Sequence, residues 1–172
     1  MALDPTRFDE LLKLAKHSAV HLEMRDGYMR SDPAFIQWQA GEVLDPAALW
    51  PQWYELVGEA VSRGVVVRRA RIVSEPLSDY VQFEHAITEG LNLAAGEDVR
   101  WLSRRQATDL ALPGNDFWLF DGKLVLVNHF DGDGEPTAPE LVDDPAVTEL
   151  CATAFAAVWE RGVPHATYTP AR

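Results

Sequence analysis

Hydrophobic positions recur along this chain with two different periods, and the two periods alternate through its first half. A spacing of three to four residues predicts helices up to residue 14 and over 33–40, 46–63, 80–95 and 145–159. Alternating or continuous apolar runs predict strands over 19–24, 65–73, 98–104, 117–120 and 124–130. The chain is therefore expected to contain a sheet with helices packed on its faces.

Turn and capping residues sharpen these boundaries. Asp45-Pro46 is typical of a helix start, because Asp caps free N–H groups and Pro tolerates the first turn. Asp121-Gly122 joins two apolar runs and predicts a β-hairpin. Crossovers early in the chain and a hairpin later predict an α/β (α+β) fold. We expect a mixed, largely antiparallel sheet flanked by helices, in a single globular domain over 1–172.

Composition and charge narrow the class of protein. The chain has 172 residues, six of them Trp, and a domain of this length buries about 70% of its unfolded surface. Its net charge of −12 argues against direct binding to nucleic acid. The N-terminal residues do not resemble a secretory signal, and no apolar run is long enough to cross a membrane. These observations predict a cytoplasmic protein that does not bind membranes.

Arginine is concentrated in the middle of this acidic chain. Arg69 and Arg71 point to one face of a predicted strand, and Arg100 and Arg104 share a face of the next. If the two strands are neighbours, the four guanidinium groups would cluster and bind a phosphate or carboxylate. The alternative is that these residues lie at the solvated edge and pair with the many carboxylates.

The helix predicted from residue 80 carries a second candidate group. Tyr80 and Glu84 are four residues apart and share one helix face, and His85 follows Glu84 directly. A Glu and a His could supply acid-base chemistry, since His titrates near neutral pH. A capped amphipathic helix explains the same residues without any chemistry.

The run from Asn115 to Leu124 is the most distinctive block of the sequence. It is similar to the strand of phospholipase D-like sheets that carries the nucleophilic His and the phosphate-binding Lys. Asn115 and Phe117 stand at those two positions here, so the nucleophile is missing. The resemblance implies a degenerate phospholipase D-like fold without that catalysis. Asp116, between these two residues, is retained as a candidate ligand-binding group.

Other motifs for metals, cofactors or catalysis are weak or absent. His129 with Asp131 and Asp133 could bind a metal, but the intervening glycines favour a turn at a strand end. Cys151 lies in an apolar helical run and is expected to be buried and inert. The nucleotide-binding glycine motifs, the His-Glu-x-x-His motif and the Gly-x-Ser-x-Gly motif do not occur. We therefore expect no metal, no cofactor and no assigned catalytic residue.

Several blocks resemble a family of uncharacterised actinobacterial proteins, a domain of unknown function about as long as this chain. The resemblance lies in Ser74-Glu75-Pro76-Leu77-Ser78-Asp79-Tyr80, Val99-Arg100-Trp101-Leu102, Asn115-Asp116-Phe117-Trp118-Leu119-Phe120-Asp121 and Phe130-Asp131-Gly132. Members of that family are often encoded beside helix-turn-helix regulators. The resemblance implies a regulatory role next to such a partner, and it carries over no catalytic residue.

Two functions remain open at this stage. The first is a non-enzymatic binding or regulatory module that contacts a helix-turn-helix partner protein or a small anionic ligand. The alternative is a small enzyme that acts on an anionic substrate, with Glu84 and His85 as acid-base groups. Both use the same candidate ligand-binding residues, which are Arg69, Arg71, Arg100, Arg104, Tyr80, Glu84, His85 and Asp116.

Overall fold

The computed structural model describes the backbone of residues 5–171 and the side chains of residues 8–171. Helices form where the apolar period predicts them, and short turns of other helical types follow α5, β3 and β7. The α-helices are α1 (Pro5–Leu14), α2 (Pro33–Gln39), α3 (Pro46–Leu49), α4 (Pro51–Ser62), α5 (Asp79–Thr88) and α6 (Pro145–Arg161). The short turns are the π-helical η1 (Glu89–Leu93) and the 3-10 turns η2 (Arg104–Gln106) and η3 (His165–Thr167).

One seven-stranded sheet runs through the molecule in the order β6-β5-β4-β1-β2-β3-β7. Its strands are β1 (Ser18–Glu23), β2 (Val66–Val73), β3 (Asp98–Ser103), β4 (Asp116–Phe120), β5 (Leu124–Asn128), β6 (Glu140–Val142) and β7 (Val163–Pro164). Only the β1–β2 and β2–β3 pairs are parallel, and the other pairs are antiparallel. The expected mixed, largely antiparallel sheet with flanking helices is thereby confirmed.

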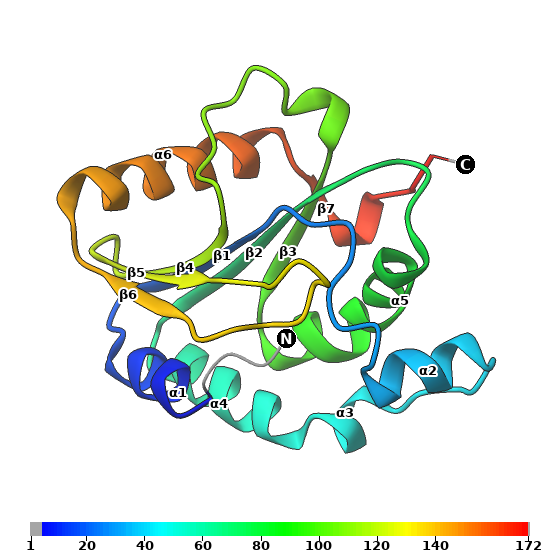
Figure 1. Cartoon of the computed structure of the whole chain (residues 1–172). Helices are drawn as coiled ribbons and strands as arrows, with labels where there is room; N and C mark the ends of the chain where they lie inside the picture. Colours follow the sequence, from blue (N-terminus) through cyan, green and yellow to red (C-terminus); the bar gives the residue numbers. More distant parts are fainter. Residues whose placement is uncertain (1–4, 172) are drawn as a thin grey trace.

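The helices cover the two faces of this sheet unequally (Figure 1). On one face α6 packs through Ala154 and Phe155 against Ile72 and Leu102 of the parallel strands. On the other face α1 and α4 pack against Trp118. The helix α5 lies beside them on that second face, and the polar groups described below lie beneath it.

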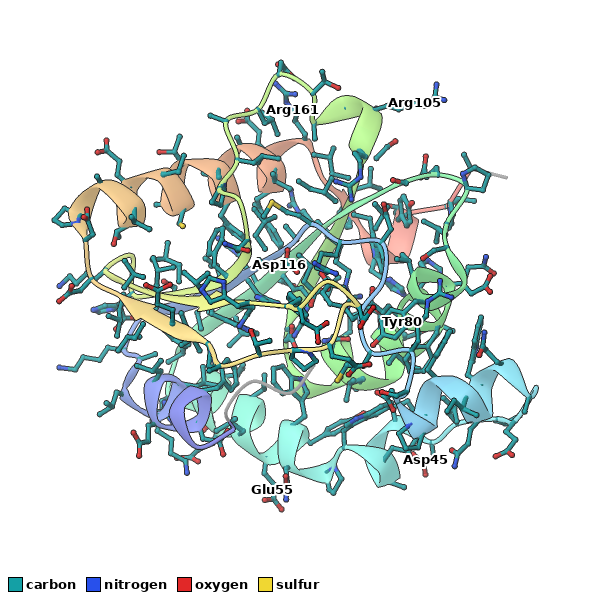
Figure 2. All side chains as sticks on the ribbon, in the orientation of Figure 1. Asp45, Glu55, Tyr80, Arg105, Asp116 and Arg161 are labelled. Atoms are coloured by element: carbon teal, nitrogen blue, oxygen red, sulfur yellow. The ribbon has the colours of Figure 1, made fainter. Side chains whose placement is uncertain are left out.

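Labelled side chains show how this arrangement divides the charged and polar residues (Figure 2). Glu55, Arg105 and Arg161 lie at the periphery of the molecule, whereas Asp116 and Tyr80 point into its interior. Asp116 is 2% exposed and Tyr80 is 4% exposed. A buried carboxyl group is costly unless its surroundings are polar, so the interior of this face must contain compensating groups.

The structure differs from the sequence-based expectation at two helices and at the sheet edges. The helix expected over 46–63 is split at Trp50, because the residue before a proline avoids the helical conformation and Pro51 has no N–H to continue it. The helix expected over 80–95 changes to π-helical hydrogen bonding at η1. The strands β6 and β7 are too short to show an alternating pattern, and the sequence did not predict them.

The predicted Asp121-Gly122 hairpin forms between β4 and β5, with positive φ angles of 50° and 65°. Its Asp121 carboxylate also accepts hydrogen bonds from the backbone N–H groups of Lys16, His17 and Ser18, at 2.7–3.0 Å for the shortest contact of each. Burial acts to raise the pKa of Asp121, but these bonds together outweigh it and hold that pKa below its ordinary value. The carboxylate therefore fastens this hairpin to the start of β1.

We expect Asp121→Ala to lower the free energy of unfolding by about 2–3 kcal/mol, because charged hydrogen bonds are lost and alanine is strained at positive φ. Urea unfolding measures this loss. Asp121→Asn is the matched control, since asparagine tolerates positive φ and keeps one acceptor oxygen, and it should lose less. Equal stability of the alanine variant and the natural protein would show that these bonds contribute nothing.

Candidate functional site

The register of the central strands brings three charged residues together on the α5 side of the sheet. Glu23 on β1 lies directly across from Arg71 on β2, and His21 lies across from Arg69. Residues two apart on a strand share a face, so all four side chains point the same way. They meet near the carboxyl ends of the parallel strands, and the strand order reverses at β1. Ligands in open α/β sheets usually bind at such a switch point.

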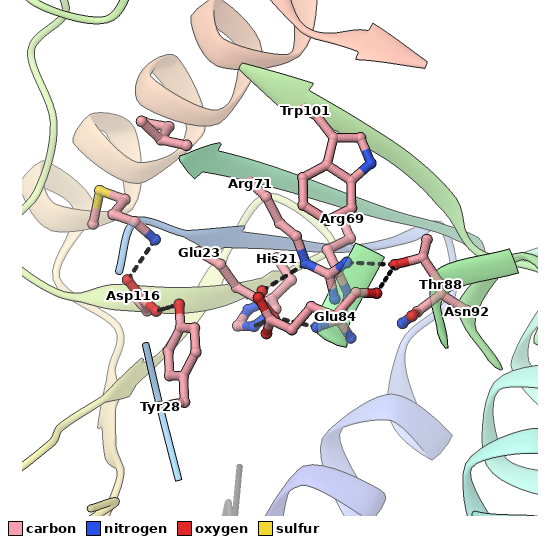
Figure 3. A network of polar contacts seen from close by, with 12 residues as sticks. His21, Glu23, Tyr28, Arg69, Arg71, Glu84, Thr88, Asn92, Trp101 and Asp116 are labelled. Carbon is pink, nitrogen blue, oxygen red and sulfur yellow. Dashed lines mark hydrogen bonds and ion pairs between the residues drawn. The ribbon is translucent and has the colours of Figure 1, made fainter. Parts of the chain in front are cut away.

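Glu23 is the centre of a buried ionic network (Figure 3). Its Oε2 accepts a hydrogen bond from Nε of Arg71 at 2.9 Å, and its Oε1 pairs with Nη1 of Arg69. Arg69 also donates through Nε to Oε2 of Glu97, at 2.9 Å. Nη1 of Arg71 donates to Oγ1 of Thr88 at 2.7 Å. The two guanidinium groups are thus joined to two carboxylates and to the helix above them.

Glu97 is the second anchor of this network. It directly precedes β3, and its Oε1 accepts from Nε1 of Trp53 at 2.8 Å and from Nδ2 of Asn92 at 2.9 Å. Trp53 comes from α4 and Asn92 from the π-helical turn η1. This carboxylate therefore ties two separate segments, α4 and η1, to Arg69 on β2. Irregular π-helical turns often occur at functional sites, and here the turn places Asn92 beside the network.

The charges of the network are matched. Burial by itself raises the pKa of the Glu23 carboxyl, but Arg71 and Arg69 outweigh it and hold that pKa well below its usual range. The neighbouring carboxylates likewise raise the pKa of both arginines, although burial alone would lower it. Buried ion pairs gain little net stability over apolar packing, yet breaking one is costly. The network therefore fixes the geometry of this face rather than simply stabilising it.

A cavity of about 180 Å³ lies over the network, between the sheet, α4 and α5. Water occupies about 30 Å³ per molecule in the liquid, so the space would hold roughly six waters or a small organic molecule. Trp50, Trp53 and Leu91 are only partly buried and form its rim. Most of the side chains in its walls are aromatic or charged. The lining residues are Glu23, Tyr28, Asp32, Trp50, Trp53, Arg69, Arg71, Tyr80, Phe83, Glu84, Ile87, Leu91, Asn92 and Trp118.

Glu84 differs from the other carboxyl groups of the cavity. It is 9% exposed and lines the cavity beside Glu23 and Arg71. Burial raises its pKa to about 8, Arg71 acts in the opposite direction, and Glu23 adds to the increase. Burial and Glu84 also raise the pKa of Tyr80 far above its usual value. The Glu84 carboxyl group therefore holds its proton more strongly than an exposed glutamate does.

Asp116 and Tyr28 form a second buried pair beside the cavity. Oδ2 of Asp116 accepts from the Tyr28 hydroxyl, and Oδ1 accepts from the backbone N–H of Met24 at 2.9 Å. Burial raises the pKa of Asp116 to about 7, although the hydrogen bond from Tyr28 favours its charged form. Tyr28 lines the cavity and Asp116 does not. Asp116 therefore acts on the cavity by positioning the tyrosine ring.

Comparisons with known proteins identify the family of the chain and solved structures with a similar fold. Residues 6–170 match the model of a family described as "Domain of unknown function (DUF6879)". The chain belongs to the DUF6879 family. This confirms the family of unknown function inferred from the sequence blocks. No curated relative matches the DUF6879 chain in sequence.

Solved structures resemble the DUF6879 chain in fold. Nuc from Salmonella typhimurium, a phospholipase D family member, matches with a TM-score of 0.53 and 14% identity, over 92% of this chain and 88% of Nuc. The phospholipase D-like fold expected from the sequence is thus supported by this likeness. The archaeal chromatin protein TrmBL2, described as having a novel mode of DNA binding, matches with a TM-score of 0.48 and 15% identity, over 92% of this chain and 49% of TrmBL2.

The structure brings together only some of the arginines that the sequence grouped. Arg100 is paired with Ala70 in the β2–β3 register, so it points to the opposite face from Arg69 and Arg71 and donates to the backbone oxygen of Trp159. Arg104 follows β3 in η2, and its Nη2 donates to the backbone oxygen of Met24 at 2.6 Å. The expected cluster of four guanidinium groups is therefore wrong, because a shift of one residue reverses the face of a strand.

Glu84 and His85 are likewise separated. Adjacent helical residues point about 100° apart, so Glu84 faces the cavity while His85 faces the C-terminal segment. The His85 ring lies 4.9 Å from the ring of His165 and 5.3 Å from that of Trp101. Burial lowers the pKa of His85, and Arg71 adds to this. The two residues therefore do not form an acid-base pair in one cavity.

Two members of the network, Glu23 and Glu97, were missed by the sequence analysis. Glu23 ends an apolar strand on the same face as His21, and a charged residue in that position is a signal of a buried partner. Glu97 lies between the helix-ending Gly96 and a strand, where a polar residue is ordinary. Only its contacts with Trp53 and Arg69 distinguish it.

The candidate metal ligands and the cysteine take part in ordinary structural contacts. Oδ1 of Asp131 accepts from the backbone N–H groups of Asp133 and Glu135, as expected for a turn, and Nε2 of His129 lies 3.0 Å from Glu140. In the described part of the chain, no group of three or more His, Cys, Asp or Glu could hold a metal ion. Cys151 is buried, and burial raises its thiol pKa to about 11. Among the described helices, none has the length and apolar character needed to cross a membrane.

Proposed function

We propose that this chain is a non-enzymatic binding module that takes a small molecule into the cavity beneath α4 and α5. The observation that carries the proposal is the preformed cavity with aromatic walls, which the buried carboxyl group of Glu84 also lines. Concave, aromatic cavities with few polar groups are typical small-molecule sites.

The wider role that we propose is regulatory, in the cytoplasm of an actinobacterium, beside a helix-turn-helix partner protein. Its support is the family resemblance together with the net charge of −12, which would speed the encounter with a basic DNA-binding protein. In this proposal the ligand acts on the partner contact through α5 and the C-terminal segment. That segment packs against the far side of α5, where His165 meets His85.

A thermal-shift experiment with a blocked cavity tests the binding function. We expect at least one compound from a panel of small organic cations, anions and neutral metabolites to raise the melting temperature by roughly 5–10 °C at a hundredfold excess over its Kd. Leu91→Trp places a larger ring at the rim and should abolish this shift. Leu14→Trp, at a 72% exposed position on α1, is the matched control and should preserve it.

Two results would count against the binding function. One is that no compound of any charge shifts the melting temperature of the natural chain. The other is a shift of the same size in the Leu91→Trp variant, which would place the ligand elsewhere. An anionic ligand, as the sequence suggested, is one outcome that the panel can return.

A further inference from the structure

We infer that the segment over residues 163–171, which contains β7 and η3, is a pH-sensitive latch. It stays docked while His85 and His165 are uncharged, and it is released when these two histidines take up protons. This inference goes beyond the binding function and needs no ligand in the cavity. It follows from the contacts that hold the segment, from the ring nitrogens of the two histidines and from the charges around them.

The segment is held mainly by aromatic side chains. It lies along β3 and beside α5, and β7 pairs with β3 at only two positions (Figure 1). The ring of Tyr168 stacks on that of Trp101, with centroids 5.3 Å apart and planes 6° apart. The Tyr168 hydroxyl donates a hydrogen bond to the carboxylate of Glu75. Because the backbone pairing is so short, docking depends on these side-chain contacts.

His165 holds the segment through a ring nitrogen that must carry no proton. Nε1 of Trp101 donates a hydrogen bond to Nδ1 of His165, at 3.1 Å. An indole N–H can only donate, so Nδ1 of His165 is the acceptor in this contact. A protonated imidazole carries a hydrogen on both nitrogens and accepts at neither. Protonation of His165 therefore replaces this hydrogen bond with two donors that face each other.

His85 on α5 faces the same ring from the other side of the contact. Its ring centroid lies 4.9 Å from that of His165 and 5.3 Å from that of Trp101. Nε2 of His85 is buried and has no hydrogen-bond partner among the described residues. A protonated ring would leave a buried N–H without an acceptor, and two charged rings at this distance would repel each other. Docking therefore requires a neutral His85 as well.

The charged groups that face the two histidines come from three other segments. The Arg71 guanidinium on β2 lies 4.9 Å from the Trp101 ring centroid, and it repels a positive charge on either histidine. Glu89 in η1 attracts a charge on His165. Glu75, in the loop before α5, already accepts from the tyrosine hydroxyl of the segment. The nearest fixed positive charge thus opposes protonation of both rings.

These surroundings set the direction of the pH dependence. Burial, with Arg71 adding to it, lowers the pKa of His85 from its ordinary value of 6.5. Burial, then His85 and Arg71, also lower the pKa of His165, and Glu89 opposes them only in part. In the released segment both rings face water and regain the ordinary pKa. The free energy of docking is therefore fully present above about pH 6.5 and is lost as the pH falls through the docked pKa values.

Release changes the surface that the chain presents. Trp101 is 0% exposed while the segment is docked, and β7 covers the edge of β3. Removal of the segment uncovers this ring and this strand edge together. An uncovered strand edge offers free N–H and C=O groups with which another chain can pair. The latch therefore controls access to the β3 edge of the sheet.

Hydrogen exchange measured by mass spectrometry tests the latch on the full chain. Exchange over residues 163–171, corrected for the intrinsic effect of pH on amide exchange, is compared at pH 7.5 and pH 5.5. At one pH unit below the ordinary pKa, each histidine that must lose a proton to dock weakens docking by about tenfold. We expect the corrected exchange of this segment to rise by about tenfold to a hundredfold, while the exchange of α6 stays unchanged.

Glutamine variants assign the response to the two histidines. His85→Gln and His165→Gln each remove one titrating ring, and each should show a smaller rise than the natural chain. The double variant should show no rise, since glutamine does not titrate in this range. His17→Gln, at an exposed position before β1, is the matched control and should respond as the natural chain does.

Three outcomes overturn the inference. One is equal corrected exchange of residues 163–171 at both pH values in the natural chain. Another is an equal rise in α6, because the whole chain would then be unfolding. The third is a full pH response in both single variants, which would assign the response to other groups, such as Glu75. If the double variant is already unprotected at pH 7.5, the two single variants give the decision.

Discussion

Replacing Glu23 with glutamine is expected to lower the free energy of unfolding by about 3–5 kcal/mol, the cost of breaking a buried ion pair from one side. Glu23 joins Arg69 and Arg71 in the centre of the sheet, and all three side chains are less than a tenth exposed. Glutamine would leave Arg71 without a buried counter-charge. Arg69 keeps Glu97, so the loss should remain within this range.

Urea unfolding of the natural chain, Glu23→Gln and the exposed control Glu55→Gln measures this effect. The control should change the free energy of unfolding by less than about 0.5 kcal/mol, as is usual for surface positions. A loss below about 1 kcal/mol for Glu23→Gln would mean that water reaches the network and that its charges are not desolvated.

The loss of unfolding free energy caused by Glu23→Gln is expected to become smaller at low pH. The pKa of Glu23 is held well below its ordinary value of 4.5 in the folded state. A group with a lowered folded pKa contributes stability that is present above the unfolded pKa and is lost as the pH falls through the folded pKa. The difference between the natural chain and Glu23→Gln should therefore be constant at neutral pH and should shrink below about pH 4.5.

The opposite substitution effect is expected at Glu84, where glutamine should stabilise the fold by about 3 kcal/mol at pH 7. Burial raises the folded pKa of Glu84 from 4.5 to about 8. Stability from such a group is fully present below the unfolded pKa and is lost as the pH rises towards the folded pKa. At pH 7 the unfolded chain has ionised Glu84 and the folded chain has not, so the folded state is disfavoured.

A pH series of unfolding experiments checks this prediction. The advantage of Glu84→Gln should be absent near pH 4, should grow by up to about 1.4 kcal/mol per pH unit above the unfolded pKa, and should level off above about pH 8. A variant that is less stable than the natural chain across this range would show that Glu84 is ion-paired.

The carboxyl groups of Glu23 and Glu84 are expected to have opposite effects on the stability of the fold. Glu23 is compensated by two arginines, and its removal harms the fold. Burial raises the pKa of Glu84, and its replacement by glutamine should help the fold. A group that lowers stability without a structural benefit is expected at a functional site rather than in a core.

The sequence by itself determined the elements and the class of fold. The apolar periods identified the strands over β1 to β5 and the long helices, and Asp121-Gly122 identified the hairpin. These signals are local, since they arise from the period of each element and from turn residues with special φ angles. The sequence also indicated Arg69, Arg71, Tyr80 and Glu84, which all line the cavity.

Only the tertiary structure decided which charges are paired. Glu23 and Arg71 are 48 positions apart, and they meet because β1 and β2 are parallel in one particular register. The same register places Arg100 on the opposite face and assigns Glu97 to Arg69. Pairing between strands is not encoded in the period of either strand, so the sequence could suggest an anion-binding arginine cluster. The assembled sheet instead pairs Arg69 and Arg71 with buried carboxylates and places Glu84 in the cavity wall, because burial and pairing are properties of the packed interior.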